Sequence, residues 1–428
     1  MFTLTPEQRL VLPAHAWSKE ATYGPDGIKA VNILTDPFYA NVLGVVPGIS
    51  GGNRGFNQES DVIVATADGR DLNALWTEFQ ATVRLRNETR QTLIDFLTYP
   101  QTQAVEDVYQ MGATDDFEVA SEFGVPKSIR GGGSYFSLGF SFEWYDLATR
   151  FTWKFLAEAT AAQVEAQNQA ALEADNRMVF TEVMRTLFRN TNRTADINAK
   201  GGTGGLTTAY NVYAFYNNDG TTPPDYKANT FTNTHTHYLT SGAATVDAGD
   251  LEEMEDHLTH HGYSTENGND LVLMVNKAQG DTIRGFRSVA NGGTARYDFV
   301  PAQNTPSFLV PTNLALAPGQ TRPPATLRGM KVIGAYGQFT IVEESYIPSG
   351  YMVGFATGGS ASLSNPVGIR EHQNPQLRGL RLVKGRSADY PLQEAYYQRG
   401  FGTGIRQRGA GVVMKITTGA YSIPTQYA

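Results

Sequence analysis

The sequence predicts a mixed α+β fold, and three of its segments carry that prediction. Residues 160–189 bear one apolar stripe with helical spacing, whereas residues 116–143 alternate in part between apolar and polar side chains, as strands do. Residues 271–275 form a short apolar run with a helical pattern on either side, which is typical of a buried strand in a compact subdomain. The chain of 428 residues is long enough for about two to three domain-sized units.

The segment 160–189 is the clearest single element. Thr160 and Gln163 fit a capping box at its start, and Arg185 and Arg189 lie in its last turn, where they complement the helix dipole. About thirty residues at 1.5 Å each give a rod of roughly 45 Å. A coiled coil is the alternative, but the pattern is too short and too rich in alanine to favour it.

The segment 116–143 predicts a long hairpin. Its arms are Phe117–Phe123 and Tyr135–Phe142, and the stretch Pro126–Gly133 between them is basic and rich in glycine. A glycine-rich tip can also be a phosphate loop. This one lacks the GxxxxGK[ST] order and does not lead directly into a helix, so phosphate binding is not favoured.

The other segments complete the prediction. Residues 1–70 suit an extended arm that is ordered on a neighbouring subunit, or else a disordered terminus. Residues 71–98 have helical spacing, which Pro100 ends, and Asp247 or Asp250 caps a helix that precedes the strand 271–275. Further elements are a short helix at 278–286 and strands at 331–335, 339–343, 350–356, 380–383 and 411–417.

Composition excludes several classes of function. The chain has no cysteine, so disulfides, thiolate nucleophiles and cysteine-based zinc sites are absent. Its formal net charge of −8 disfavours a protein that coats DNA, because Lys and Arg supply the affinity for phosphates. There is no apolar run of transmembrane length, and the N-terminal residues lack the order of a signal peptide, so we expect no membrane partner.

The histidines offer weak evidence for a metal. His257 and His261 have the i, i+4 spacing that can share a zinc ion, but Leu258 stands where HExxH has its glutamate. If His235 and His237 lie on a strand, we expect them to point to opposite faces or to bracket one residue. We therefore predict surface or helix-end histidines and no metal site.

No other group of residues indicates a reaction. The acidic run Glu252–Asp256 is expected to be a solvated helix face, and Gly400–Gly404 lacks the strand and helix context of a nucleotide-binding loop. There is no GxSxG motif and no kinase signature. The sequence therefore predicts no catalytic residue, no cofactor and a protein that is not an enzyme.

Several runs of the sequence resemble the major capsid proteins of tailed phages, in particular those of actinobacteriophages, which have the HK97-like fold. The runs that carry this resemblance are Phe123–Lys127, Leu138–Phe140, Trp144–Leu156, Ala170–Phe180 and Gln393–Ile405. The resemblance implies an N-terminal arm with helices at 1–110 and an E-loop at 111–150. It further implies a P-domain with the spine helix at 151–235 and 366–428, and an inserted A-domain at 236–365.

The function that the resemblance implies is a virion shell, assembled in the host cytoplasm from hexamers and pentamers. The shell would enclose double-stranded DNA without sequence-specific binding, and scaffold, portal and decoration proteins are the expected partners. We expect subunit contacts at Lys127 and Arg130 in the E-loop and at Phe38 and Tyr39 in the arm. Some members of the family join Lys to Asn covalently, but no matching Asn and acid can be assigned to Lys127.

Three alternatives differ in kind. An encapsulin-like shell of the same fold would package a protein cargo instead of DNA. A secreted or phage-tail binding protein would be rich in β-structure, which the long helix at 160–189 disfavours. An enzyme would need a site that the sequence does not display.

Overall fold

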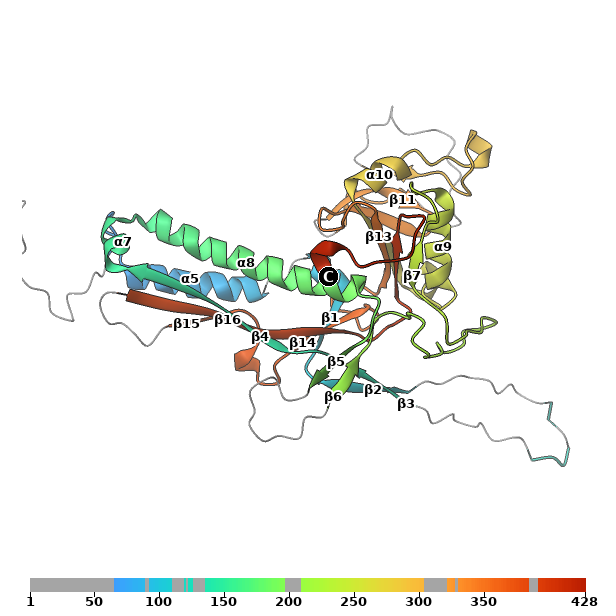
Figure 1. Cartoon of the computed structure of the whole chain (residues 1–428), viewed down its shortest axis with the longest axis horizontal. Helices are drawn as coiled ribbons and strands as arrows, with labels where there is room; N and C mark the ends of the chain where they lie inside the picture. The colour runs from blue at the N-terminus through green and yellow to red at the C-terminus, as the bar shows by residue number, and fades with distance from the viewer. Residues whose placement is uncertain are drawn as a thin grey trace, which may run out of the picture. The chain divides into compact units, whose positions relative to one another are not determined.

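The fold was established from a computed structural model of the chain (Figure 1). The chain divides into two units, Met1–Val64 and Ala65–Ala428. The first unit lies outside the described residues, so the fold is that of the second. The structure describes residues 65–88, 92–109, 119–120, 122–125, 135–196, 209–303, 322–327, 330–384 and 392–428.

The second unit contains both helices and strands, as the sequence predicts, and the strands predominate after α10. The helices are α5 (Leu72–Glu88), α6 (Thr92–Leu97), α7 (Trp153–Glu158), α8 (Ala161–Phe188), α9 (Ala248–Thr259) and α10 (Lys277–Ile283), with short 3-10 turns at Thr265–Asn267, Val289–Asn291, Pro375–Leu377 and Thr425–Tyr427. The strands before α9 are β1 (Thr98–Gln101), β2 (Val105–Tyr109), β3 (Tyr135–Gly139), β4 (Glu143–Thr152), β5 (Arg193–Asp196), β6 (Ala209–Val212) and β7 (Tyr238–Thr240). The strands after α9 are β8 (Asp270–Val275), β9 (Val300–Pro301), β10 (Thr326–Leu327), β11 (Met330–Tyr336), β12 (Phe339–Glu343), β13 (Tyr351–Thr357), β14 (Val367–Glu371), β15 (Arg381–Lys384), β16 (Leu392–Ile405) and β17 (Gly411–Lys415).

Helix α8 confirms the prediction for residues 160–189. It begins after the capping box of Thr160 and Gln163, in which the Thr160 N–H donates to Gln163 Oε1 at 3.0 Å. Its second half carries Phe180, Val183 and Leu187 into the main hydrophobic core. The capping residues and the apolar stripe lie within the helix itself, which is why local sequence identified it.

A large sheet with the strand order β10-β11-β12-β8-β13-β17-β7 forms the centre of the fold, and β9 pairs with β11. Strand β8 is buried on both faces. Val272 and Met274 pack in the core that includes the end of α8, whereas Leu271, Leu273 and Val275 pack in the core that includes α9 and α10. Figure 1 shows α9 and α10 beside this sheet. Helices on both faces explain why the run is continuously apolar.

A second sheet has the order β1-β14-β16-β15, and β4 also pairs with β16. Strands β4 and β16 form an antiparallel ladder from Leu392↔Thr152 to Phe401↔Glu143. We call β4, β16 and β15 the ribbon; it runs alongside α8 in Figure 1. A bidentate ion pair joins the two, with Arg399 Nε and Nη2 at 2.6 and 2.9 Å from the carboxylate oxygens of Asp175.

The predicted hairpin needs a correction. Strand β3 (Tyr135–Gly139) pairs with β2 (Val105–Tyr109), which precedes the predicted first arm of the hairpin. The described residues 119–120 and 122–125 are outside any strand. Alternation of apolar side chains reports a half-exposed segment, but it does not identify the pairing partner, so the sequence placed the hairpin too late in the chain.

Sequence reasoning also missed β4 and β16. The sequence predicts no helix or strand between the segments 116–143 and 160–189, yet β4 and α7 lie there. The glycine cluster at 400–404 lies within β16, where a Cβ on Gly402 would come within 1.9 Å of the Ser141 carbonyl oxygen. Glycine is needed here because another backbone segment crosses closely, which agrees with the absence of a nucleotide-binding loop.

Candidate functional site

A polar region of the interior lies where α8 ends and the chain turns toward the large sheet. Its centre is Arg408, which is buried although it carries a full charge. The guanidinium donates to Asp219 Oδ2 at 2.7 Å, to Thr221 Oγ1 at 2.6 Å and to the Ala214 carbonyl oxygen at 2.8 Å. A buried cation is tolerated when its donors are paired in this way.

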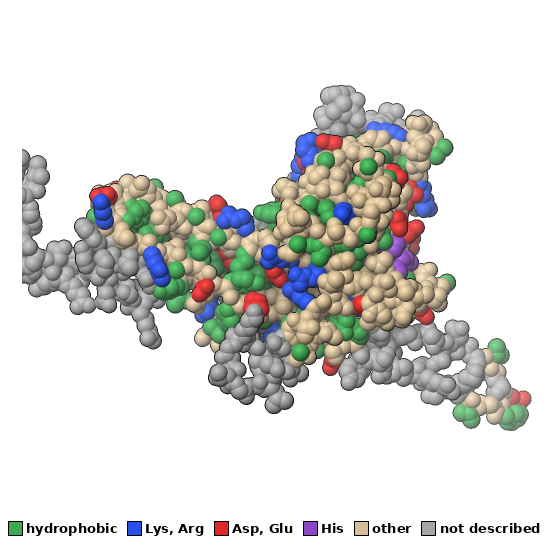
Figure 2. Space-filling model, viewed as in Figure 1, with side chains coloured by type: hydrophobic (Ala, Val, Ile, Leu, Met, Phe, Trp, Pro, Cys, Tyr) green, Lys and Arg blue, Asp and Glu red, His purple; other side chains and the backbone are tan. Residues whose placement is uncertain are grey.

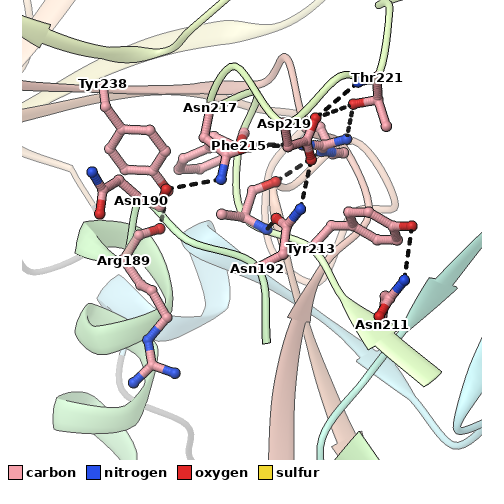
Figure 3. A network of polar contacts seen from close by, with 12 residues as sticks. Arg189, Asn190, Asn192, Asn211, Tyr213, Phe215, Asn217, Asp219, Thr221 and Tyr238 are labelled. Atoms are coloured by element: carbon pink, nitrogen blue, oxygen red, sulfur yellow. Dashed lines mark hydrogen bonds and ion pairs between the residues drawn. The ribbon is translucent and has the colours of Figure 1, made fainter. Parts of the chain in front are cut away.

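Asp219 is the anionic half of this pair. Its carboxylate also accepts from Thr221 Oγ1 at 2.5 Å and from Asn192 Nδ2 at 2.6 Å (Figure 3). Burial alone would raise the pKa of Asp219, but the hydrogen bonds from Thr221 and Asn192 and the charge of Arg408 lower the pKa below its usual value. The carboxylate therefore stays charged at neutral pH and completes the pair.

The same region closes the C-terminal end of α8. Asn217 Nδ2 donates to the Asn190 carbonyl oxygen at 2.8 Å, and Tyr238 Oη donates to the Arg189 carbonyl oxygen. Figure 3 shows these groups beside the Asp219 network. Because the last carbonyls of a helix lack partners within the helix, these side chains fix the direction in which the chain leaves α8.

Next to this network the structure brings together His235, His237, His260 and His261. The Nε2 atoms of the first two lie 3.1 Å apart, and each lies 3.0 Å from His261 Nε2. His237 is fully buried, and its Nδ1 lies 2.7 Å from the Gly411 carbonyl oxygen. We call these four residues the histidine cluster.

The cluster corrects two expectations. His235 and His237 converge, because side chains two residues apart along an extended segment point to the same side. His257, whose spacing from His261 would allow a shared metal ion, instead places its Nδ1 2.9 Å from the Glu253 carbonyl oxygen. The four histidines are buried or half-buried and not simply surface residues. An HxH pair together with adjacent histidines was the available signal.

Burial also sets the charge of the cluster. It lowers the pKa of His235 and of His260 to about 4, and neighbouring histidines add to the effect. Burial lowers the pKa of His237 and of His261 further still. At neutral pH the described geometry therefore holds four uncharged imidazoles, whose free nitrogens are Lewis bases.

Aromatic rings enclose one side of the cluster. Phe231 stacks on His261 with ring centres 4.3 Å apart, and Tyr216 stacks on it at 5.6 Å. His261 and Arg408 both line a pocket of about 410 Å³, to which Tyr216, Tyr226 and Tyr263 also contribute. The Arg408 network and the histidine cluster are thus two parts of one region.

The acidic run on α9 is less exposed than expected. Glu252 Oε1 accepts from Tyr336 Oη at 2.7 Å, and Glu255 accepts from the N–H and the side-chain amide of Gln338 at 3.1 and 3.0 Å. Burial raises the pKa of Glu255. These carboxylates anchor α9 to the β11–β12 turn, whereas Glu253 and Asp256 form the exposed part of the run.

The predicted subunit contacts Lys127, Arg130, Phe38 and Tyr39 lie outside the described residues. Near the first two, the structure identifies apolar side chains that sequence reasoning did not single out. Val119, Phe123 and Val125 are 96, 92 and 92% exposed. Exposed clusters of large apolar groups mark contact surfaces more often than single exposed residues do.

Comparisons with known proteins show what the chain is similar to. No family model and no curated protein matches it. A solved structure from Mycobacterium phage Patience is 43% identical, covers 89% of this chain and 98% of its own, and has a TM-score of 0.66.

Two other solved structures are more distant. The capsid of a native GTA particle is 13% identical over 78% of this chain and 92% of its own, with a TM-score of 0.42. The SrpI encapsulin of Synechococcus elongatus is 12% identical over 80% of this chain and 96% of its own, with a TM-score of 0.41. Neither likeness bears on the function of this chain.

The mixed helix-and-sheet fold and the 43% identity to a phage structure define a protein of virus particles. This chain belongs to the major capsid proteins of tailed phages. Its function is structural: it forms the shell that encloses the phage DNA, and its place is the virion. The capsid function is favoured over the encapsulin-like alternative, because the structure that is 43% identical to this chain comes from a phage. None of the helices among the described residues is long and apolar enough to cross a membrane.

Proposed function

We propose that the chain closes its shell from hexamers and pentamers in which each subunit lays an extended loop on its neighbour. In this proposal residues 1–110 are the N-terminal arm with its helices and 111–150 the E-loop. Residues 151–235 and 366–428 are the P-domain, and 236–365 the A-domain, with β17 completing the A-domain sheet from the C-terminal segment. The observation that carries the proposal is the exposure of Val119, Phe123 and Val125.

These three side chains expose apolar surface that a second copy of this chain would cover. Burying a large apolar side chain contributes about 1.5–3 kcal/mol, so the set favours association strongly. A shell of one chain brings the same surface to every neighbour, which makes a second copy the natural occupant. The ordering of a loop costs free energy, and this burial can offset that cost.

The base of the loop is held firmly within the subunit, which lets the loop act as a directed contact. Leu138 and Phe140 are buried where β3 ends. The Phe140 carbonyl oxygen accepts from Tyr210 Oη at 2.7 Å and from Arg370 Nη1 at 3.0 Å. Strand β3 also pairs with β2, so both ends of the loop leave from one ladder.

The ribbon offers a second contact surface. The pairing register puts Trp144, Ala148 and Val383 on one face, away from the Asp175–Arg399 pair. Trp144 is 46% exposed and Val383 36% exposed. In the proposal this outer face of the ribbon meets other P-domains, and it would lose water there as interface cores do.

Lys127, Arg130, Phe38 and Tyr39 stay in the proposal as contact residues. The two cations would pair with carboxylates of an adjacent subunit, which a chain of net charge −8 supplies readily. Reversing both charges should hinder assembly more than it lowers the melting temperature of the subunit. Scaffold, portal and decoration proteins are the proposed further partners, and the proposed role includes no catalysis.

The experiment combines Phe123→Ser with Val125→Ser, and Ala120→Ser in the same exposed segment is the matched control. We expect the double variant to keep the melting temperature of the wild-type subunit and to form few or no closed particles by negative-stain electron microscopy. The control should assemble normally. Normal particles from the double variant would overturn the role of the loop.

A further inference from the structure

We propose that the histidine cluster binds one first-row transition-metal cation of the zinc type, which clamps the segment before β7 to the end of α9. The ligands are His235, His237 and His261, with His260 as the fourth. This inference concerns the interior of one subunit and does not depend on the proposed subunit contacts.

The three Nε2 atoms form a nearly equilateral triangle with edges of 3.0–3.1 Å. Nitrogen ligands of a tetrahedral zinc ion, each 2.0–2.1 Å from the metal, lie about 3.3 Å from one another. The cluster therefore already holds three nitrogens at nearly the spacing of three zinc ligands. Small rotations of the imidazole rings would supply the remaining few tenths of an ångström.

Hydrogen bonds alone do not explain this triangle. The Gly411 carbonyl oxygen can only accept, so His237 Nδ1 carries the proton and donates it there at 2.7 Å. In neutral His237 the Nε2 is then a bare lone pair, which faces the other two nitrogens. An N–H group points at one acceptor, so three mutual contacts cannot all be good hydrogen bonds. One cation between them satisfies all three lone pairs.

The fourth histidine supplies an independent observation. His260 Nε2 is buried and has no hydrogen-bond partner. The ligand atoms offered by the four histidines all lie within 4.8 Å of one another. A buried polar atom without a partner costs about 1–3 kcal/mol, and coordination to the metal would remove that cost. His260 thus completes a set of four nitrogen ligands.

The donor set selects the kind of cation. Imidazole nitrogens suit Zn²⁺, Co²⁺, Ni²⁺ and Cu²⁺, whereas Mg²⁺ and Ca²⁺ require oxygen ligands. The four ligand atoms lie within 4.8 Å of one another, and neutral imidazole is the form that coordinates such a metal. The rings of Phe231 and Tyr216 shield the site, and Figure 2 shows histidine side chains at the surface of the flank beside α9.

The supporting contact of His237 extends the clamp to a third segment. Metal-binding histidines commonly donate their second ring N–H to a backbone carbonyl, which fixes the orientation of the ring. Here that carbonyl belongs to Gly411, the first residue of β17. The cation would therefore cross-link segments near residues 235, 260 and 411. In chains that have cysteine, a disulfide can provide such a cross-link.

The test uses the full chain, purified without a histidine tag, and measures its metal content. We expect about one Zn²⁺ per chain after equilibration with micromolar zinc and removal of free metal. Co²⁺ in place of Zn²⁺ should give the visible absorption of a tetrahedral nitrogen site. A chelator should lower the thermal midpoint, and added Zn²⁺ should restore it.

Three substitutions separate this site from chance binding. His261→Gln should abolish stoichiometric zinc and the chelator response, whereas His257→Gln, on the same helix end but outside the cluster, should keep both. His260→Gln, which alters a half-buried ligand, serves if the first variant does not fold, and it should weaken zinc binding at least tenfold. Wild-type protein without stoichiometric zinc, or equal zinc in wild type and the His260 and His261 variants, would overturn the proposal.

Discussion

The large sheet and strand β4 of the ribbon are both regular, yet they bury their side chains to very different extents. Every residue of β13 is buried, and in β8 all but Asp270 are buried. In β4 no residue is fully buried, although all ten pair with β16. The comparison teaches that backbone pairing does not indicate where stability lies: the central strands of the sheet are covered within one subunit, whereas β4 keeps side-chain surface exposed.

The largest loss of stability is expected from a substitution in the core of the large sheet. Phe339→Ala removes a fully buried ring from β12, and we expect the free energy of unfolding to fall by about 3–5 kcal/mol. Chemical denaturation of the unassembled subunit measures this loss. Thr340→Ser, at the next and half-buried position of the same strand, should change it by less than about 1 kcal/mol. Equal losses would mean that the sheet is not the stable part.

The next largest effect is expected where the ribbon meets α8. Arg399→Ala leaves Asp175 charged with its side chain 4% exposed, which should cost about 3 kcal/mol. Removing Asp175 as well should recover part of that loss, because no unpaired charge remains. A double-mutant cycle by denaturation measures the coupling. A coupling near zero would show that packing alone, such as Leu172 on Tyr397, holds the ribbon.

A substitution on the outer face of the ribbon should lower the stability of the subunit only slightly and the yield of assembled particles more strongly. Trp144→Ala should lower the free energy of unfolding by about 1 kcal/mol or less, because the ring is half exposed. The yield of closed particles, measured by electron microscopy and sedimentation, should fall clearly. If particle yield and stability fall in proportion, the outer face has no separate role in assembly.

The smallest expected effect concerns pH and the start of α9. Burial raises the pKa of Asp250 to about 6, so the folded state holds a proton that the unfolded state releases near pH 4. Stability should therefore fall as pH rises from about 4 to about 6, by about 1 kcal/mol once solvent screening is allowed for. Asp250→Asn keeps an acceptor for the Asp247 N–H and should remove this contribution. An unchanged pH profile of unfolding in the variant would contradict the assignment.

Sequence reasoning succeeded where the determining residues are neighbours in the chain. The capping box at Thr160 and the apolar spacing of α8 are local, and so are the Asp247 cap of α9 and the run that becomes β8. It failed where the partner is distant. The apolar residues of β3 could not reveal that β2 is its partner, and β4 shows no alternation because neither of its faces is fully covered.

The sequence did not predict the histidine cluster for the same reason, since two segments that are separated along the chain contribute to it. The spacing of His235 and His237 did carry a signal, because side chains two positions apart in an extended segment lie on the same face. Nothing local indicated that the turn after α9 would bring His260 and His261 to meet them. The Arg408 network was equally invisible, because Asp219 lies far from Arg408 along the chain.

The position of β17 in the large sheet affects when, during its synthesis, a subunit can finish folding. This strand lies inside the large sheet, between β13 and β7, and the N–H of Val413 donates to the His237 carbonyl oxygen at 2.9 Å. The sheet therefore cannot finish forming on the ribosome until residues 411–415 have been synthesised and released from it. A nascent chain that stops earlier lacks an interior strand of this sheet, so we expect a subunit truncated before β17 to be unable to complete its fold.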